Sequence, residues 1–181
     1  MPENLFGLPT HVLLQHVVVV MLPIAAVAAL LVAVWAWYRH HFGVATLVAT
    51  FFATLFVPLT TQSGESLVGR LPESPAIAAH VAAGGRVQWV AAIFGLCLFA
   101  VVALDIRRRA SVTAELAPAE AWVNRRTPDR WREAAPGWTA PALTVARALL
   151  VVAAVAVVVV VVQAGHSGAQ AVWTDFPNLK P

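Results

Sequence analysis

The chain has 181 residues, of which 60% are hydrophobic and 12% are charged, and its mean hydropathy is +0.76. Soluble domains carry about 25% charged residues, so this composition excludes an ordinary soluble domain. The net charge of +3 does not indicate a nucleic-acid-binding protein, because no recognition motif accompanies the basic residues. The single cysteine, Cys97, excludes an intramolecular disulfide and a metal site built from cysteines.

Four apolar segments are each long enough to cross a bilayer, whose hydrocarbon core of roughly 30 Å needs about 20 helical residues. They cover residues 12–38, 44–61, 86–106 and 141–164. The first segment lacks a basic start and is too long for a cleavable signal peptide, so we expect it to stay in the mature protein. The sequence therefore predicts an all-α, polytopic transmembrane four-helix bundle that forms a single domain over residues 1–181.

The distribution of basic residues predicts how this bundle is oriented, because Lys and Arg concentrate in cytoplasmic loops. Nine of the twelve basic residues lie on one side: Arg39, Arg107, Arg108, Arg109, Arg125, Arg126, Arg130, Arg132 and Arg147. The other three, Arg70, Arg86 and Lys180, lie on the opposite side. Both termini are therefore expected to be extracytoplasmic. The Arg-rich, Lys-poor composition is typical of high-GC bacteria, which predicts a multi-pass protein of the bacterial cytoplasmic (inner) membrane.

Residues 107–140 form the largest predicted cytoplasmic segment. Pro118 and the Thr127-Pro128 pair are typical of helix starts, since proline fits the first helical turn. Three tryptophans alternate with arginines there, namely Trp122, Trp131 and Trp138. This mixture predicts short interfacial helices on the anionic inner leaflet. No internal repeat is evident along the chain.

Four of the six histidines fall in one layer near the predicted outer boundary of the bilayer. From the helical rise, His16 lies about 15 Å and His166 about 20 Å from the bilayer centre, and His11 and His80 roughly 22–25 Å. Arg86 and several glutamines, including Gln163, share this layer. Polar groups at membrane depth are costly unless they are paired, so this layer is the candidate functional site.

Imidazole is a ligand for haem iron, copper and zinc, and a four-helix bundle commonly holds a cofactor between facing helices. A non-covalent b-type haem needs only two histidines on different helices. We take His16 and His166 as the first axial pair, because they lie closest to the bilayer centre. His80 and His11 are then further ligands or hydrogen-bonding groups. Arg86 is the candidate partner of a propionate, and Gln163 shares a helix face with His166. The alternatives are a copper or zinc site and purely structural interfacial histidines.

Short motifs around these histidines resemble an uncharacterised bacterial family of four-span membrane domains of unknown function. Its opening motif is similar to His-Pro-x-x-Val-His-Phe-Pro-Ile, and residues 11–18 keep the spacing between His11 and His16 without the prolines. Its ending, Gly-His-x-Gly-Gly, is similar to residues 165–169, where Ala169 departs from the pattern. The middle part resembles Ser63-Gly64-Glu65 followed by His80. Related domains occur beside Rieske or cytochrome c domains, so the resemblance implies a membrane redox role.

The leading hypothesis is a membrane-embedded, bis-histidine haem b electron-transfer subunit with its site at the extracytoplasmic face. Its expected partners are membrane lipids, quinone, and a redox partner protein or a larger membrane complex. Two alternatives stay open: a non-catalytic accessory subunit of a respiratory complex, and a copper- or zinc-binding membrane protein. The sequence leaves open whether the protein is an enzyme, and it favours an electron-transfer or accessory subunit over a stand-alone enzyme.

Overall fold

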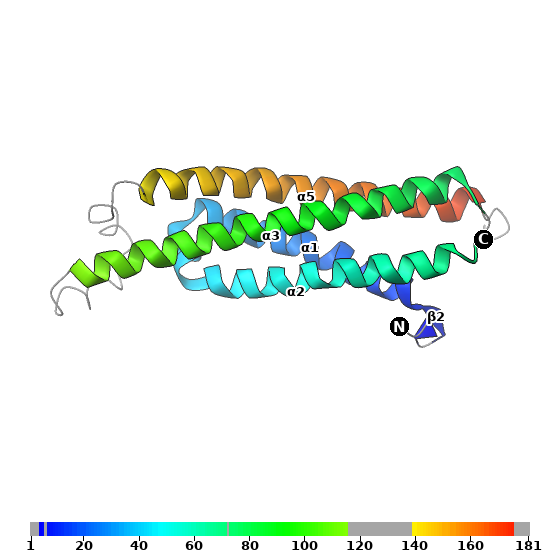
Figure 1. Ribbon diagram of the computed structural model, residues 1–181, viewed down its shortest axis with the longest axis horizontal. Helices are drawn as coiled ribbons and strands as arrows, with labels where there is room; N and C mark the ends of the chain where they lie inside the picture. Colours follow the sequence, from blue (N-terminus) through cyan, green and yellow to red (C-terminus); the bar gives the residue numbers. More distant parts are fainter. Residues whose placement is uncertain (1–3, 6, 72, 116–138, 176–181) are drawn as a thin grey trace.

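The computed structural model describes residues 4–5, 7–71, 73–115 and 139–175, which form four long helices after a very short hairpin (Figure 1). The helices are α1 (Thr10–Val34), α2 (Ala36–Val68), α3 (Pro75–Glu115) and α5 (Thr139–Asp175). The hairpin pairs β1 (Asn4–Leu5) with β2 (Leu8–Pro9) in antiparallel fashion, and Gly7 between them has a φ of 80°. The predicted all-α four-helix bundle is confirmed.

The four helices form a closed ring in which each one packs against two neighbours. Helix α1 packs against α2 and α5, and α3 packs against the same two helices, so that α1 and α3 face each other diagonally. Fully buried side chains fill the axis between them, including Leu22, Val32, Phe94, Leu98, Leu150 and Val157. Both described ends of the chain lie at the same end of the bundle (Figure 1).

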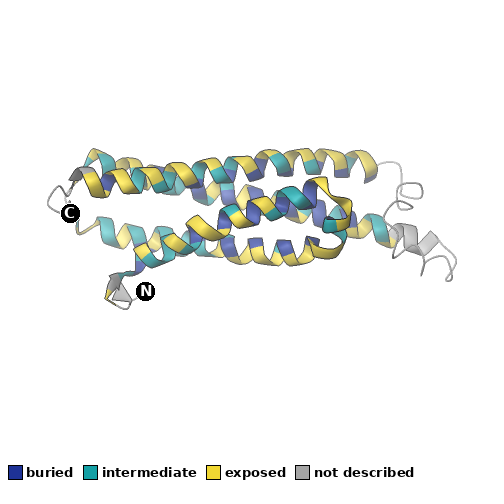
Figure 2. Cartoon of the chain, turned by 180° about the vertical axis from the view of Figure 1, so that it is seen from behind, coloured by how far each residue is buried: buried dark blue, intermediate teal, exposed yellow. Residues whose placement is uncertain are grey.

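The outer surface of the bundle is apolar, as lipid contact requires. Ile24, Phe51, Leu96 and Val152 are each more than half exposed, and exposed positions run along the outward faces of all four helices (Figure 2). A soluble protein rarely exposes so extended an apolar surface. All four helices are long and apolar enough to cross a membrane, so this is a multi-pass membrane protein.

The helices differ from the predicted spans at several boundaries. Helix α2 covers Ala36–Val68 instead of 44–61, α3 starts at Pro75 instead of 86, and α5 ends at Asp175 instead of 164. Two further differences lie at the ends of α1 and α3. Helix α1 ends at Val34 instead of residue 38, and Trp35 alone, in an extended conformation, separates it from α2. Hydropathy does not detect so short a turn, because the residues on both sides are apolar or aromatic. Helix α3 continues to Glu115, so residues 107–115 are helical where a loop was expected. The rest of that loop, with Pro118, Thr127-Pro128 and the three tryptophans, lies outside the described residues.

Polar side chains gather at the two ends of the bundle. We call the end that carries His11 and His80 the histidine end, and the end that carries Arg39, Asp105 and Arg147 the arginine end. Between His11 and Val34, α1 rises about 35 Å, slightly more than the hydrocarbon core of roughly 30 Å. The two polar clusters therefore lie near opposite boundaries of the bilayer.

Candidate functional site

At the histidine end, the rings of His11 and His80 meet across the bundle axis. His11 comes from the first turn of α1 and His80 from the first turns of α3, the helix diagonally opposite. The ring centres are 6.1 Å apart, and the ring planes stand at 79° to each other. Both side chains are half-buried. The bundle thus brings two of the four predicted histidines together from distant parts of the chain.

A backbone carbonyl of the neighbouring helix holds each ring by its Nδ1 atom. His11 Nδ1 lies 2.9 Å from the carbonyl oxygen of Thr60 on α2, and His80 Nδ1 lies 3.1 Å from that of Ala164 on α5. A carbonyl oxygen only accepts, so Nδ1 donates in both bonds. In a neutral imidazole the lone pair is then on Nε2. This is the arrangement in which a protein presents histidine to a metal.

A serine hydroxyl lies beside the Nδ1 atom of each ring and bonds the same carbonyl. The Ser63 hydroxyl donates to the Thr60 carbonyl at 2.8 Å and lies 3.5 Å from His11 Nδ1. The Ser167 hydroxyl donates to the Ala164 carbonyl at 3.0 Å and lies 3.3 Å from His80 Nδ1.

The glycines that follow these serines allow the rings to approach the backbone. A Cβ atom at Gly64 would lie 2.8 Å from Cε1 of His11, and one at Gly168 would lie 3.0 Å from Cε1 of His80. Both distances are too short for an ordinary contact. Gln15 also reaches this place, since its Nε2 atom would be 3.4 Å from the same Gly168 Cβ. Glycine is therefore the residue that fits beside each ring.

The two halves of the site repeat each other with approximate two-fold symmetry about the bundle axis. In the α1–α2 pair, His11 precedes its carbonyl and serine partners by 49 and 52 residues. In the α3–α5 pair, His80 precedes its partners by 84 and 87 residues. Both separations differ by the same 35 residues, so the segment between the two partners is longer in the α3–α5 pair by that number. Sequence reasoning found no repeat because the shared residues are few and far apart. One signal was present: the chain has only two Ser-Gly pairs, at residues 63–64 and 167–168.

The other predicted site residues lie on the outside of the bundle: His16, His166, Arg86 and Gln163 are exposed. His16 Nδ1 bonds the Val12 carbonyl of its own helix at 2.6 Å. His11 and His16 are five residues apart, about 140° around a helix, so only one of them can face the axis. The structure therefore pairs His11 with His80 and does not bring the expected axial pair, His16 and His166, to the bundle axis.

The arginine end holds a buried ionic cluster that sequence reasoning did not predict. Arg39 and Asp105 are each only 8% exposed, and Arg39 Nε donates to Asp105 at 3.1 Å. Arg109, one turn after Asp105, donates to the other carboxylate oxygen. Arg39 Nη1 also donates to the Val32 carbonyl at 2.8 Å, at the end of α1. The sequence predicts Arg39 between two spans, as an indicator of orientation, whereas it lies in the first turn of α2.

Two imidazoles on facing helices are donors that suit haem iron, copper and zinc. Haem supplies four nitrogens of its own and takes two ligands from the protein, a number that His11 and His80 would provide. Among the described residues, no group of three or more His, Cys, Asp or Glu side chains is arranged to hold a metal ion.

Comparison of the chain with protein-family models, with curated proteins and with solved structures found no match. The site is therefore interpreted from its own geometry.

Proposed function

We propose that the protein is a membrane-embedded b-type haem subunit for electron transfer, with the iron held by Nε2 of His11 and of His80. The pairing of the two rings across the bundle axis carries this proposal. The two imidazoles come from diagonally opposite helices and would hold the iron between them through Nε2. The two ring centres here are 6.1 Å apart.

The surroundings of the rings support the same assignment. Each Nδ1–H group donates to a carbonyl, which orients the ring and leaves the Nε2 lone pair for a metal. Gly64 and Gly168 fix the distance of each ring from the neighbouring helix. Haem would supply one-electron chemistry, while the chain holds the ligands in place at the edge of the hydrocarbon core.

The proposal includes an orientation in which the histidine end faces the outside of the bacterial inner membrane. It rests on the excess of arginine at the opposite end and in residues 107–132. The electron partner would then be quinone in the outer half of the bilayer or a redox protein at its surface. A reporter domain fused after Pro181 should give an extracytoplasmic signal, and a cytoplasmic signal would contradict this orientation.

The test of haem binding is the absorption spectrum of the detergent-purified full chain, oxidised and dithionite-reduced, after expression with sufficient haem. We expect a Soret band and the sharp reduced bands of a six-coordinate, low-spin haem. His11→Ala and His80→Ala should each abolish or shift these bands. The matched controls, His16→Ala and His166→Ala, remove exposed histidines of α1 and α5 and should leave the bands unchanged.

Two results would point away from haem. A colourless preparation that contains copper or zinc bound through His11 and His80 would support the metal-binding alternative. A colourless, metal-free preparation whose stability depends on another membrane subunit would support the accessory-subunit alternative. Loss of haem in the exposed-histidine variants but not in the paired-histidine variants would contradict the proposed ligands.

A further inference from the structure

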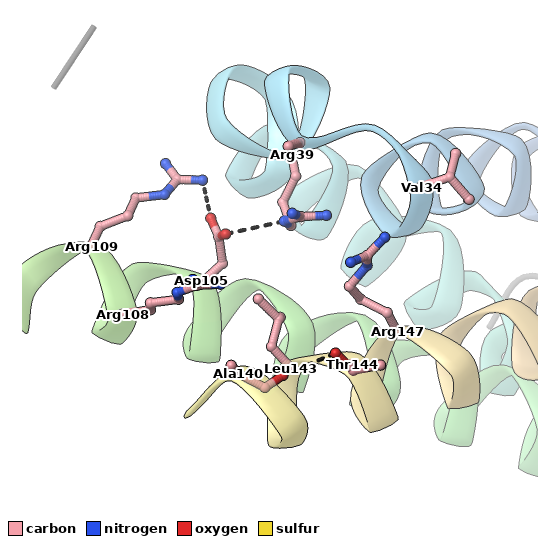
Figure 3. Close-up of a pocket in the computed structure, with 10 residues that line it drawn as sticks. Val34, Arg39, Asp105, Arg108, Arg109, Ala140, Leu143, Thr144 and Arg147 are labelled. Carbon is pink, nitrogen blue, oxygen red and sulfur yellow. Dashed lines mark hydrogen bonds and ion pairs between the residues drawn. The ribbon is translucent and has the colours of Figure 1, made fainter. Parts of the chain in front are cut away.

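The arginine end contains a cavity of about 410 Å³, within the range of roughly 300–1,000 Å³ that is typical of small-molecule sites. Residues of all four helices line it (Figure 3). They include Val34 at the end of α1, Arg39 on α2, Asp105 and Arg108 on α3, and Leu143 on α5. This cavity lies about 35 Å from the paired histidines along α1 and does not depend on what they bind.

The described lining residues carry more positive than negative charge. Arg39, Arg108, Arg109 and Arg147 supply four guanidinium groups, whereas Asp105 supplies one carboxylate. Figure 3 shows Asp105 between Arg39 and Arg109, with Arg147 reaching from α5 towards the end of α1. Each guanidinium group carries five N–H donors, so one that already bonds a protein group can still donate to an anion, and its planar donors match phosphate oxygens.

The N-terminus of α5 adds to this preference for an anion, and the C-terminal carbonyls of α1 do not oppose it because they already accept hydrogen bonds. The carbonyls that end α1 are occupied, since Arg39 donates to Val32 and Arg147 donates to Ala33. Helix α5 starts at Thr139, and Ala140 in its first turn lines the cavity. The N-terminus of a helix carries a partial positive charge and unsatisfied N–H groups, both of which favour anions. Cationic side chains and a helix N-terminus thus act on the same space.

We infer that this cavity binds a phosphate-bearing anion, either the headgroup of an anionic phospholipid or free phosphate. The cavity lies near the boundary of the hydrocarbon core, where phospholipid phosphates lie. Apolar lining residues, Val34 and Leu143, stand beside the guanidinium groups and suit the glycerol edge of a lipid. Basic pockets between transmembrane helices are known sites for anionic headgroups.

The experiment uses the detergent-purified full chain and two probes, a short-chain phosphatidylglycerol and inorganic phosphate, with short-chain phosphatidylcholine as the zwitterionic control. Binding is followed by native mass spectrometry and by the rise in Tm. We expect phosphatidylglycerol to bind about tenfold more tightly than phosphatidylcholine, as a charge-assisted hydrogen bond predicts. A Tm rise with inorganic phosphate alone would instead identify free phosphate as the ligand.

The variants assign the binding to the cavity. Arg147→Gln should weaken the binding of the anion about tenfold. If that variant does not fold, Arg108→Gln on α3 should lower the same affinity and serves as the second variant. The matched control is Arg107→Gln, which removes the same charge at the same end from an exposed residue that does not line the cavity. Equal affinity for both lipids together with no response to phosphate would overturn the inference. Equal weakening by Arg107→Gln would also overturn it.

Discussion

At the histidine end each half-buried ring bonds a backbone carbonyl of a neighbouring helix, whereas at the arginine end Arg39 and Asp105 bond each other. Both clusters use side chains that are costly to place near a membrane. The difference lies in what satisfies them. Charges that neutralise one another connect helices and stabilise the bundle. The two rings are each oriented by one hydrogen bond, and this orientation is what the proposed haem ligation requires.

The first and largest prediction separates stability from cofactor binding. Arg39→Ala removes the partner of a buried carboxylate and should lower the free energy of unfolding by about 3 kcal/mol, while haem stays bound. His80→Ala should abolish haem binding but change the stability of the apoprotein by only about 1 kcal/mol, the value of one hydrogen bond. Denaturant titration in detergent measures the stabilities, and absorbance measures the haem.

The control for the arginine end is Arg107→Ala. This residue is exposed, so its replacement should change the free energy of unfolding by no more than about 0.5 kcal/mol. If Arg39→Ala is as neutral as Arg107→Ala, the buried ion pair does not stabilise the bundle. If Arg39→Ala removes haem from folded protein, the two ends are not separate in function.

The second prediction concerns the glycines beside the rings. Gly64→Ala and Gly168→Ala would place a methyl group 2.8 and 3.0 Å from the imidazoles, so the rings must shift and haem affinity should fall about 100-fold. Gly165→Ala is the matched control on α5, because a Cβ there meets nothing within 4 Å. It should retain haem and stabilise the helix by up to about 1 kcal/mol. Haem content after purification and titration with added haem measure the effect.

The third and smallest prediction tests the two-fold repeat. Ser63→Ala and Ser167→Ala remove the second group near each Nδ1 atom but leave the carbonyl in place. Each should weaken haem binding by about tenfold or less, and by similar factors. Haem titration of the two variants side by side provides the measurement. A large effect of one serine with none from the other would show that the halves are not equivalent.

Sequence reasoning predicted the fold well, because a bilayer imposes a simple length requirement on each apolar segment. It also predicted a similar depth for His11 and His80, whose rings meet at one end of the bundle, since depth follows from the helical rise. Depth does not determine which face of a helix a residue occupies. His16 was preferred for its depth, yet it points away from the axis because His11, 140° around the helix, points towards it.

The arginine end was less predictable for a different reason. Arg39 and Asp105 are 66 residues apart, and neither belongs to a recognisable motif. Their pairing depends on where α1 ends, and that turn consists of Trp35 alone within an apolar stretch. A shift of a few residues in that turn would rotate Arg39 away from Asp105, since each residue turns a helix by about 100°.

The most direct test of the central claim is the electron paramagnetic resonance spectrum of the oxidised, haem-loaded full chain. Two imidazole ligands whose planes stand near 79° to each other should give the strongly anisotropic low-spin ferric signal of near-perpendicular axial rings. That signal should disappear in His11→Ala and in His80→Ala and persist in His16→Ala. A rhombic signal typical of parallel imidazoles, a high-spin signal, or no haem signal would contradict ligation of haem by His11 and His80.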